Sequence, residues 1–276
     1  MDARWLTGEL GRALDVDAAV TSVRSTSIGT GQVGENVRFE LTWDRDDPEL
    51  PASVVGKFPS TSEVSRATAV QLNTYAKEIG FYRDLQSRVA IRTPLVHTIE
   101  WHAPTNDFAL LMEDIRPATT GDQLVGGDVR AAQLAVDQAV GLHAPTWGDA
   151  PDVGWLDGSH DEEQASLRSQ LFELLTPGFV DRYATRLAAE DLDLAPALQV
   201  AYPRWVAAVA DWADRHNGWC VVHGDYRLDN MLFGSPPASP SLTVVDWQTA
   251  SVGVGPNDIA YYCGAGLLPD VRRDHE

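Results

Sequence analysis

Residues 221–233 of the chain read VVHGDYRLDNMLF, and residues 243–248 read TVVDWQ. In each stretch, a short apolar run of the kind that forms a buried strand leads directly into polar side chains. Asp225 and Asn230 are five positions apart in the turn after the first run, and Asp246 comes directly after the second. Mg²⁺ favours sites that have few protein carboxylates and leave positions for phosphate and water. The two stretches therefore provide candidate magnesium ligands, Asn230 and Asp246.

The spacing of Asp225 and Asn230 is that of the catalytic loop of kinases. In that loop the aspartate accepts a hydroxyl proton and the asparagine binds Mg²⁺. The role of His223 stays open between two hypotheses. Its imidazole could brace the loop by hydrogen bonding, or it could ligate a metal with Asp225 and Asp246, which would make the chain a metal-dependent hydrolase. Asp229 is expected to be a solvent-facing acid.

A second motif, Gly29-x-Gly31-x-x-Gly34, is shared by two unrelated kinds of nucleotide site. In the dinucleotide-binding fold the glycines lie between a strand and a helix. Here apolar and polar residues alternate over positions 37–43, which predicts a strand. The glycines are therefore expected in a hairpin, the geometry that covers the phosphates of a nucleoside triphosphate in kinases. A glycine-rich hairpin without a ligand is the plain alternative.

Lys57 lies within a predicted apolar strand, and a lysine there is costly to bury unless it is paired. Glu78 is a natural partner, because it shares one face of a predicted helix with Tyr75 and Tyr82. In kinases such a lysine holds the α- and β-phosphates, and a helix glutamate orients it. The alternative is a surface lysine whose stem lies along apolar residues, near an unrelated exposed glutamate.

The remaining patterning predicts a small β-rich lobe, a hinge near residues 112–117 and a mostly helical lobe. We predict strands at residues 20–28, 37–43, 52–58, 95–101, 108–112, 219–222 and 242–245. We predict helices at residues 62–89 (with Ser62 as the N-cap), 129–143, 162–175, 179–189 and 194–216. The sequence therefore predicts an α+β fold with lobes at residues 1–113 and 114–276.

Composition limits the partners of the chain. With 21 Lys and Arg against 40 Asp and Glu, the 276 residues carry a net charge of −19, which disfavours nucleic acid and favours a cationic ligand. The longest apolar run, residues 205–210, is far too short to span a membrane. The first residues lack the pattern of a secretory signal, and two cysteines make no disulfide framework. We therefore expect a cytoplasmic protein.

Taken together, these segments resemble the aminoglycoside phosphotransferase, choline kinase and ecdysteroid-kinase-like family. The shared features, which run from about residue 28 to 262, are glycines 29–34, Lys57, Glu78, the strand and hinge at 108–114, His223-Gly-Asp225 with Asn230, Asp246-Trp-Gln248 and the GPNDIA segment at 255–260. The LHA segment at 142–144, together with Trp147, is similar to the ecdysteroid-kinase-like branch.

The resemblance implies the two-lobe fold of protein kinases and the use of ATP and Mg²⁺. It places adenine against the backbone of Leu111, Met112 and Glu113, and the phosphates beneath Gly29, Gly31 and Gly34 and beside Lys57, which Glu78 orients. It further implies that Asn230 and Asp246 hold Mg²⁺, that Asp225 aligns the acceptor hydroxyl, and that Asp258 braces the catalytic loop.

Two features depart from the family pattern. Arg227 stands where many aminoglycoside kinases have histidine and protein kinases often have lysine. Its guanidinium could still neutralise the transferring phosphoryl group, as a fork of donors instead of a point charge. The chain also ends soon after Tyr262, where members of the family usually continue with further helices. It is therefore expected to be either truncated or an unusually short member, and both alternatives bear on the stability of the helical lobe and on activity.

The acceptor is expected to be a small molecule. Only twelve positions separate Asp246 from Asp258, which is too short for the activation segment on which a protein kinase docks a peptide. The acidic balance favours an amine-bearing acceptor, although sugar and steroid-like hydroxyls stay open. Two other classes of function also stay open: a nucleotide-binding relative without activity, and the metal-dependent hydrolase built on His223, Asp225 and Asp246.

Overall fold

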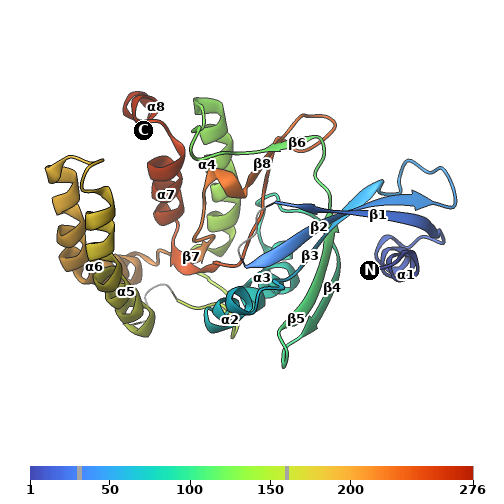
Figure 1. Ribbon diagram of the computed structural model, residues 1–276, viewed down its shortest axis with the longest axis horizontal. Coiled ribbons are helices and arrows are strands. Elements are labelled where there is room, and N and C mark those ends of the chain that lie inside the picture. The colour runs from blue at the N-terminus through green and yellow to red at the C-terminus, as the bar shows by residue number, and fades with distance from the viewer. Residues whose placement is uncertain (30–32, 159–161, 276) are drawn as a thin grey trace.

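The computed structural model describes residues 1–29, 33–158 and 162–275, with residues 162–165 described by their backbone alone. It consists of an antiparallel sheet with its helices and a second, mostly helical part (Figure 1). This is the α+β arrangement that the sequence predicts. The proposed lobe boundary coincides with the end of a strand at Glu113. No helix within the described ranges is both long enough and apolar enough to cross a bilayer.

The larger sheet has five antiparallel strands in the order β1-β2-β3-β5-β4. Their bounds are β1 Val20–Ile28, β2 Gly34–Trp43, β3 Ser53–Pro59, β4 Val96–His102 and β5 Asp107–Glu113. An N-terminal helix outside the predicted pattern, α1 (Ala3–Leu14), covers one face. Its Leu6 and Leu10, one turn apart, pack on Phe39, Val54 and Leu111.

The prediction of one helix over residues 62–89 is wrong. Ser62 does cap a helix, α2 (Glu63–Gln71). This helix ends before Asn73, whose φ of 56° is left-handed. Asparagine tolerates that conformation because its short polar side chain can hydrogen-bond locally. A new helix, α3 (Thr74–Gly80), then continues into a π-helical turn at Phe81–Leu85 and a 3₁₀ turn at Gln86–Arg88. The break sets the direction of α3 independently of α2.

Among its described residues, the second part contains five α-helices and two small sheets. The helices are α4 Val129–His143, α5 Glu162–Tyr183, α6 Ala189–His216, α7 Pro256–Gly266 and α8 Pro269–His275. The sheets pair β7 Trp219–Val222 with β10 Ser251–Val254, and β6 Ala118–Thr120 with β8 Met231–Gly234 and β9 Leu242–Val244. The two helices predicted at 162–175 and 179–189 are instead one helix, α5, which continues through Pro177.

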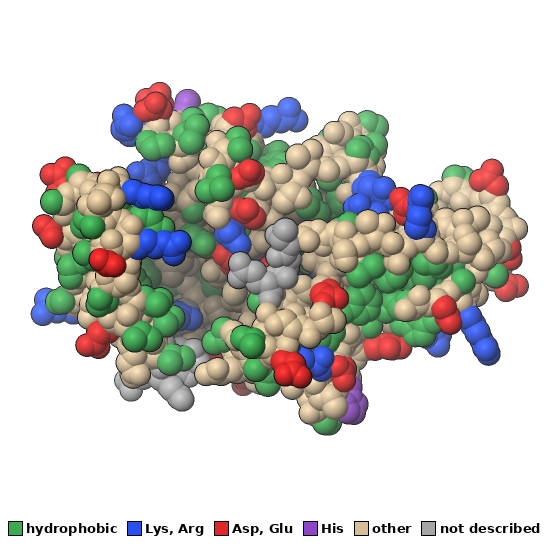
Figure 2. Space-filling model, viewed as in Figure 1, with side chains coloured by type: hydrophobic (Ala, Val, Ile, Leu, Met, Phe, Trp, Pro, Cys, Tyr) green, Lys and Arg blue, Asp and Glu red, His purple; other side chains and the backbone are tan. Residues whose placement is uncertain are grey.

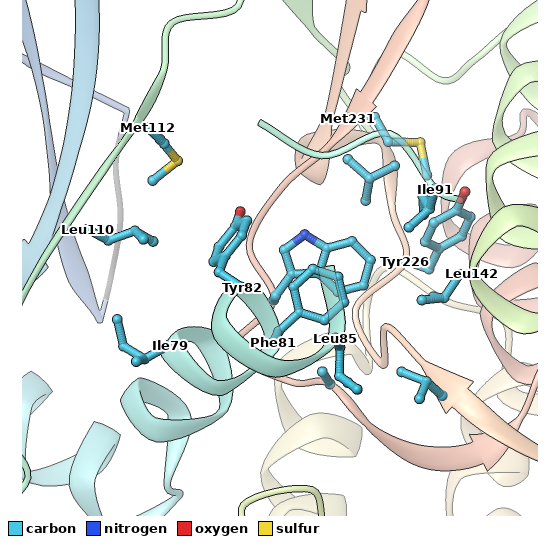
Figure 3. Close-up of a cluster of buried hydrophobic side chains, with 14 of the residues drawn as sticks. Ile79, Phe81, Tyr82, Leu85, Ile91, Leu110, Met112, Leu142, Tyr226 and Met231 are labelled. Atoms are coloured by element: carbon cyan, nitrogen blue, oxygen red, sulfur yellow. The ribbon is translucent and has the colours of Figure 1, made fainter. Parts of the chain in front are cut away.

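One hydrophobic cluster joins the two parts. Side chains of the π-helical turn and β5 meet side chains of α4 and the loop after β7, as Figure 3 shows for Phe81, Met112, Leu142 and Tyr226. At its centre the ring of Phe81 stacks on Trp247, with ring centroids 3.6 Å apart and planes 3° from parallel. Since Trp247 follows Asp246, this packing fixes that aspartate relative to the sheet. By contrast, α5 and α6 form a hairpin at one side of the molecule (Figure 1).

Candidate active site

A buried ion-pair cluster joins three segments that are distant in sequence. The Lys57 ammonium on β3 lies 2.6 Å from a carboxylate oxygen of Glu78 on α3 and 2.9 Å from Oδ1 of Asp246 after β9. Lys57 and Glu78 are 8% and 2% exposed. The prediction that these two side chains meet is confirmed, and the alternative of a surface lysine beside an exposed glutamate is wrong.

The charges in this cluster depend on one another. Burial acts to lower the pKa of the Lys57 ammonium, but the Asp246 and Glu78 carboxylates outweigh burial, and the pKa is raised. Burial acts to raise the pKa of Asp246, but the neighbouring Lys57 charge outweighs it, and that pKa is lowered. Asp246 is therefore a carboxylate at neutral pH, and Lys57 is a cation.

The backbone explains why Asp246 faces the lysine. It adopts a left-handed φ of 70° two residues after the end of β9, which turns the chain away from the strand direction. Its second oxygen, Oδ2, accepts a hydrogen bond of 3.2 Å from the Gln248 amide. The carboxylate is thus oriented by Lys57 on one side and Gln248 on the other.

The turn after β7 holds the second cluster of polar side chains. The Asn230 amide nitrogen donates to the backbone oxygen of Asp225 at 2.8 Å and to its Oδ2 at 2.9 Å. Arg227 donates from Nε to the same carboxylate at 3.1 Å. The Val245 amide donates to the carbonyl of Asn230 at 3.0 Å, which ties this turn to the residue before Asp246. The two predicted motifs are therefore adjacent in space.

His223 supports the turn through both of its ring nitrogens. Nε2 lies 3.0 Å from the Val245 carbonyl, and Nδ1 accepts a 3.3 Å hydrogen bond from the Asp225 amide. These partners require the neutral tautomer with its proton on Nε2. Because both nitrogens are engaged and the residue is fully buried, His223 braces the loop, and the metal-ligand hypothesis for it is not supported.

Asp258 on α7 holds the same loop by accepting hydrogen bonds from its backbone. Its carboxylate accepts from the amides of His223 at 2.8 Å and Gly224 at 3.0 Å, and it lies 2.9 Å from Nε2 of His143 on α4. Gly224 is needed there, since its φ is +79° and a Cβ would come within 2.7 Å of the Thr249 carbonyl oxygen. This contact of His143 could not be predicted from the sequence, because a histidine at a helix end carries no distinguishing signal.

Replacing Asp258 with alanine should destabilise the protein through this loop. The variant leaves buried donors of His223, Gly224 and His143 without an acceptor, and each unsatisfied group costs about 1–3 kcal/mol. We expect the free energy of unfolding, measured by urea denaturation, to fall by about 3 kcal/mol. Asp270→Ala is the control, because Asp270 makes an exposed pair with Arg273 and its loss should change stability by less than about 0.5 kcal/mol. Equal stability of the two variants would contradict the bracing role.

The glycine segment is described only in part. Gly31 lies outside the described residues. Gly29 ends the β1 region with a φ of +74°, and Gly34 begins β2. A Cβ on Gly34 would come within 3.0 Å of the Phe58 carbonyl oxygen and 3.4 Å of Cε of Lys57. The glycine thus permits the close approach of β2 to the lysine-bearing part of β3.

The predicted adenine-binding residues occupy different surroundings. The side chain of Leu111 packs in the cluster beneath α1, whereas Met112 belongs to the cluster that joins the two parts. Glu113 is paired with Arg92 at 2.6 Å and accepts from the Leu95 amide at 2.9 Å. The next residue, Asp114, accepts from both Arg38 and Ser53, which fixes the connection to the sheet. Sequence reasoning missed this anchor.

The donor set also fits a magnesium ion. Since the nitrogen of the Asn230 amide bonds to Asp225, its oxygen is the atom that could ligate a metal, and Asp246 provides an ionised carboxylate. Both are hard oxygen donors of the kind Mg²⁺ prefers. Among the described residues, no group of three or more His, Cys, Asp and Glu side chains gathers as a metal site. Mg²⁺ does not need one, because it typically takes one or two carboxylates plus substrate phosphates.

Comparison with known proteins agrees with this geometry. The model of the phosphotransferase enzyme family matches residues 42–272. Two solved structures share the fold: one described as the GDP and kanamycin complex of APH(2")-IIia, with a TM-score of 0.54, and one as the GDP complex of wild-type aminoglycoside 2'-phosphotransferase-IIIa, with a TM-score of 0.51. Each of these two proteins is 16% identical to this chain. The first alignment covers 98% of this chain and 80% of the kanamycin-complex chain. The second covers 99% of this chain and 81% of the other protein's chain.

Two curated proteins match over shorter stretches. Acyl-CoA dehydrogenase family member 10 of Mus musculus is 45% identical over 49 residues, or 18% of this chain and 4% of that protein. Acyl-CoA dehydrogenase family member 11 of Rattus norvegicus is 34% identical over 64 residues, which are 22% of this chain and 8% of that protein.

The family match covers most of the chain, including both polar clusters. The chain therefore belongs to the phosphotransferase enzyme family, and its fold is the protein-kinase-like fold of the aminoglycoside phosphotransferases. The recognition and the fold class predicted from the sequence are confirmed.

Proposed function

We propose that this member of the phosphotransferase family transfers the γ-phosphate of ATP to a hydroxyl of a small molecule. One observation carries the proposal: Lys57 contacts Glu78 and Asp246 together, in a cluster that the Asn230–Val245 contact joins to Asp225. A lysine held in this way can bind α- and β-phosphates. The family match and the two nucleotide-bound relatives of the same fold support this assignment.

In the proposed complex, the phosphates lie against Lys57 and the glycine segment, with adenine at the backbone of residues 111–113. Asn230 and Asp246 would hold Mg²⁺, which would neutralise developing charge on the phosphate oxygens. Glu78 keeps Lys57 in position, and Arg227 lies next to Asp225, where a guanidinium can stabilise charge on the transferring group.

Asp225 aligns the acceptor. Its carboxylate accepts a hydrogen bond from the acceptor hydroxyl and points the oxygen at the γ-phosphorus. As the new oxygen–phosphorus bond forms, the bond from the γ-phosphorus to the β–γ bridging oxygen breaks, ADP leaves, and the hydroxyl proton passes to Asp225. Because the transition state is loose, most of the rate enhancement comes from positioning and charge stabilisation.

Binding of nucleotide should raise the melting temperature. At 100 times its Kd, a ligand adds about 2.7 kcal/mol to the free energy of unfolding, or roughly 5–10 °C for a chain of this size. MgATP, MgGTP, and Mg²⁺, Zn²⁺ and Mn²⁺ each alone should be compared by calorimetry, followed by measurement of ADP release with a library of hydroxyl acceptors. The proposal predicts a shift with a magnesium nucleotide and ADP release with at least one acceptor.

Two outcomes would overturn the proposed phosphotransferase function. A shift with Zn²⁺ or Mn²⁺ but none with MgATP or MgGTP would indicate the hydrolase. A nucleotide shift without ADP release for any acceptor would indicate a nucleotide-binding relative that lacks activity.

A further inference from the structure

One buried hydroxyl joins three segments beside the nucleotide cluster. Tyr75 is the second residue of α3, and it is 3% exposed. Its hydroxyl donates to the carbonyl oxygen of Val33 at 2.6 Å and accepts from the backbone amide of Ser60 at 3.1 Å. A tyrosine hydroxyl has one proton to donate and lone pairs with which to accept, so the two contacts are compatible. Tyr75 therefore ties α3 to the residue before β2 and to the residue after β3.

The hydroxyl takes the place of the next pair in the β2–β3 ladder. At this end the ladder begins with Gly34 opposite Pro59, so Val33 and Ser60 would be the next residues to pair. The Ser60 amide donates instead to the Tyr75 hydroxyl, which in turn donates to the Val33 carbonyl. Pro59 has no N–H with which to strengthen this end of the ladder. The tyrosine thus extends the pairing of the two strands by one step.

The position of this hydroxyl is fixed by packing. The Tyr75 ring lies against Phe108 of β5, with ring centroids 5.0 Å apart, and both residues belong to the cluster that joins the two parts of the molecule. Side chains in such close-packed interiors interdigitate and have few voids into which they could move. The hydroxyl is therefore held at one point relative to the sheet.

The same face of α3 carries the partner of Lys57. Glu78 comes three residues after Tyr75, and side chains three residues apart lie on the same face of a helix. Glu78 contacts the Lys57 ammonium at 2.6 Å, whereas Tyr75 contacts the residue directly before Gly34. One turn of α3 therefore positions both the lysine and the start of β2.

Tyr75 also sets the orientation of the peptide that leads into Gly34. Because a peptide unit is planar and trans, fixing the Val33 carbonyl also fixes the Gly34 amide, which points the opposite way. Gly34 lies against the lysine stem, since a Cβ there would come within 3.4 Å of Cε of Lys57. The proposed function places phosphates at Gly34 and Lys57 and adenine at residues 111–113. The hydroxyl thus acts on the phosphate side of the site.

The contacts around this point that reach the surface are weaker. Glu35 accepts from the Thr61 amide at 3.1 Å in an exposed position. Figure 2 shows acidic and basic side chains together on the surface where the two parts of the molecule meet. Such exposed charges contribute little to holding a segment, because water and salt screen them. The buried Tyr75 hydroxyl is therefore the contact expected to matter most for the start of β2.

We propose that Tyr75 is a positioning residue for the nucleotide phosphates. Its hydroxyl holds the Val33–Gly34 peptide against Lys57, so that the start of β2 and the ammonium keep a fixed separation before the phosphates arrive. Groups that are fixed in advance avoid the cost of being ordered when the ligand binds. The inference rests on the proposed function, and Tyr75 acts through Gly34 and Lys57 instead of touching the nucleotide.

Calorimetric titration of Tyr75→Phe with MgADP and with millimolar adenosine tests the inference without an acceptor. Phenylalanine keeps the ring and its packing on Phe108 but removes the hydroxyl that joins Val33 to Ser60. We expect the Kd of MgADP to rise at least about threefold, as the loss of one hydrogen bond implies, and the Kd of adenosine to stay nearly unchanged.

Tyr262→Phe is the matched control. It also removes a buried tyrosine hydroxyl, but this one has no hydrogen-bond partner among the described residues. Both ligands should bind to this variant as they bind to the wild type.

The inference is overturned if Tyr75→Phe weakens MgADP binding by less than about threefold. It is also overturned if adenosine binding is weakened by the same factor as MgADP binding, because Tyr75 would then have a general structural role. Its failure is distinguishable from failure of the proposed function. A wild type that binds MgADP no better than Tyr75→Phe does loses only this inference. A wild type that binds no magnesium nucleotide loses the proposed function itself.

Discussion

Asp225→Asn is expected to slow phosphoryl transfer by about 10²- to 10⁴-fold while leaving nucleotide affinity nearly unchanged. The substitution removes the charge that accepts the acceptor proton but keeps an oxygen that can accept from Asn230 and Arg227. The local fold should therefore persist. The measurements are ADP release with the acceptor that gives the highest rate, and the Kd of MgATP by calorimetry.

The control for this prediction is Asp229→Asn in the same loop. Asp229 lies 3.7 Å from Arg227, and its side chain is 38% exposed. We expect this variant to retain most of the transfer rate, since Asp229 has no proposed contact with nucleotide or acceptor. Comparable turnover by wild-type protein and Asp225→Asn would refute the assignment of Asp225.

Lys57→Met should have the largest effect on stability and nucleotide binding together. The variant leaves the buried carboxylates of Glu78 and Asp246 without their cation, and breaking a buried pair in this way costs about 3–5 kcal/mol. Without the lysine, the pKa of Asp246, which Lys57 lowers in the wild type, rises, and the pKa of Glu78, which burial already raises, rises further. The folded state of the variant therefore binds more protons. Stability of the variant should therefore fall more steeply than that of the wild type as pH rises from 5 to 8.

Two further variants separate charge from packing. Lys77→Met removes the only other lysine, whose pair with Asp157 is partly exposed, and should cost less than about 1 kcal/mol. The double variant Lys57→Met/Glu78→Gln removes one of the two stranded charges and should regain part of the lost stability, but not nucleotide binding. If Lys57→Met unfolds at the same urea concentration as Lys77→Met, the buried cluster does not exist as described.

The sequence predicts which polar side chains meet at the candidate site better than it predicts the helix boundaries. Lys57 stands out because a charge within an apolar strand is costly to bury unless it is paired. Asp225, Asn230 and Asp246 stand out because they follow short apolar runs. Their neighbours in space could not be found in this way. His143 and Asp258 lie 115 positions apart, and their contact depends on the packing of α4 against α7.

The errors have local physical causes. The chain is helical on each side of Asn73, as the apolar spacing over residues 62–89 predicts. The spacing of apolar residues cannot reveal that one residue between the two helices is left-handed. In α5, Pro177 suggests a helix end, yet a proline mainly removes one hydrogen bond and kinks a helix, and this one continues to Tyr183. The α1 helix was not predicted, although its Leu6 and Leu10 are spaced one helical turn apart, the spacing of a buried helix face.

The central claim is that one cluster, formed by Lys57, Glu78 and Asp246, binds a magnesium nucleotide. The most direct test is a calorimetric titration of ATP with and without Mg²⁺, on the wild type and on Asp246→Asn. We predict that Mg²⁺ tightens ATP binding to the wild type at least tenfold and has no such effect on the variant. ATP binding that is absent from the wild type, or equally dependent on Mg²⁺ in both proteins, would contradict the claim.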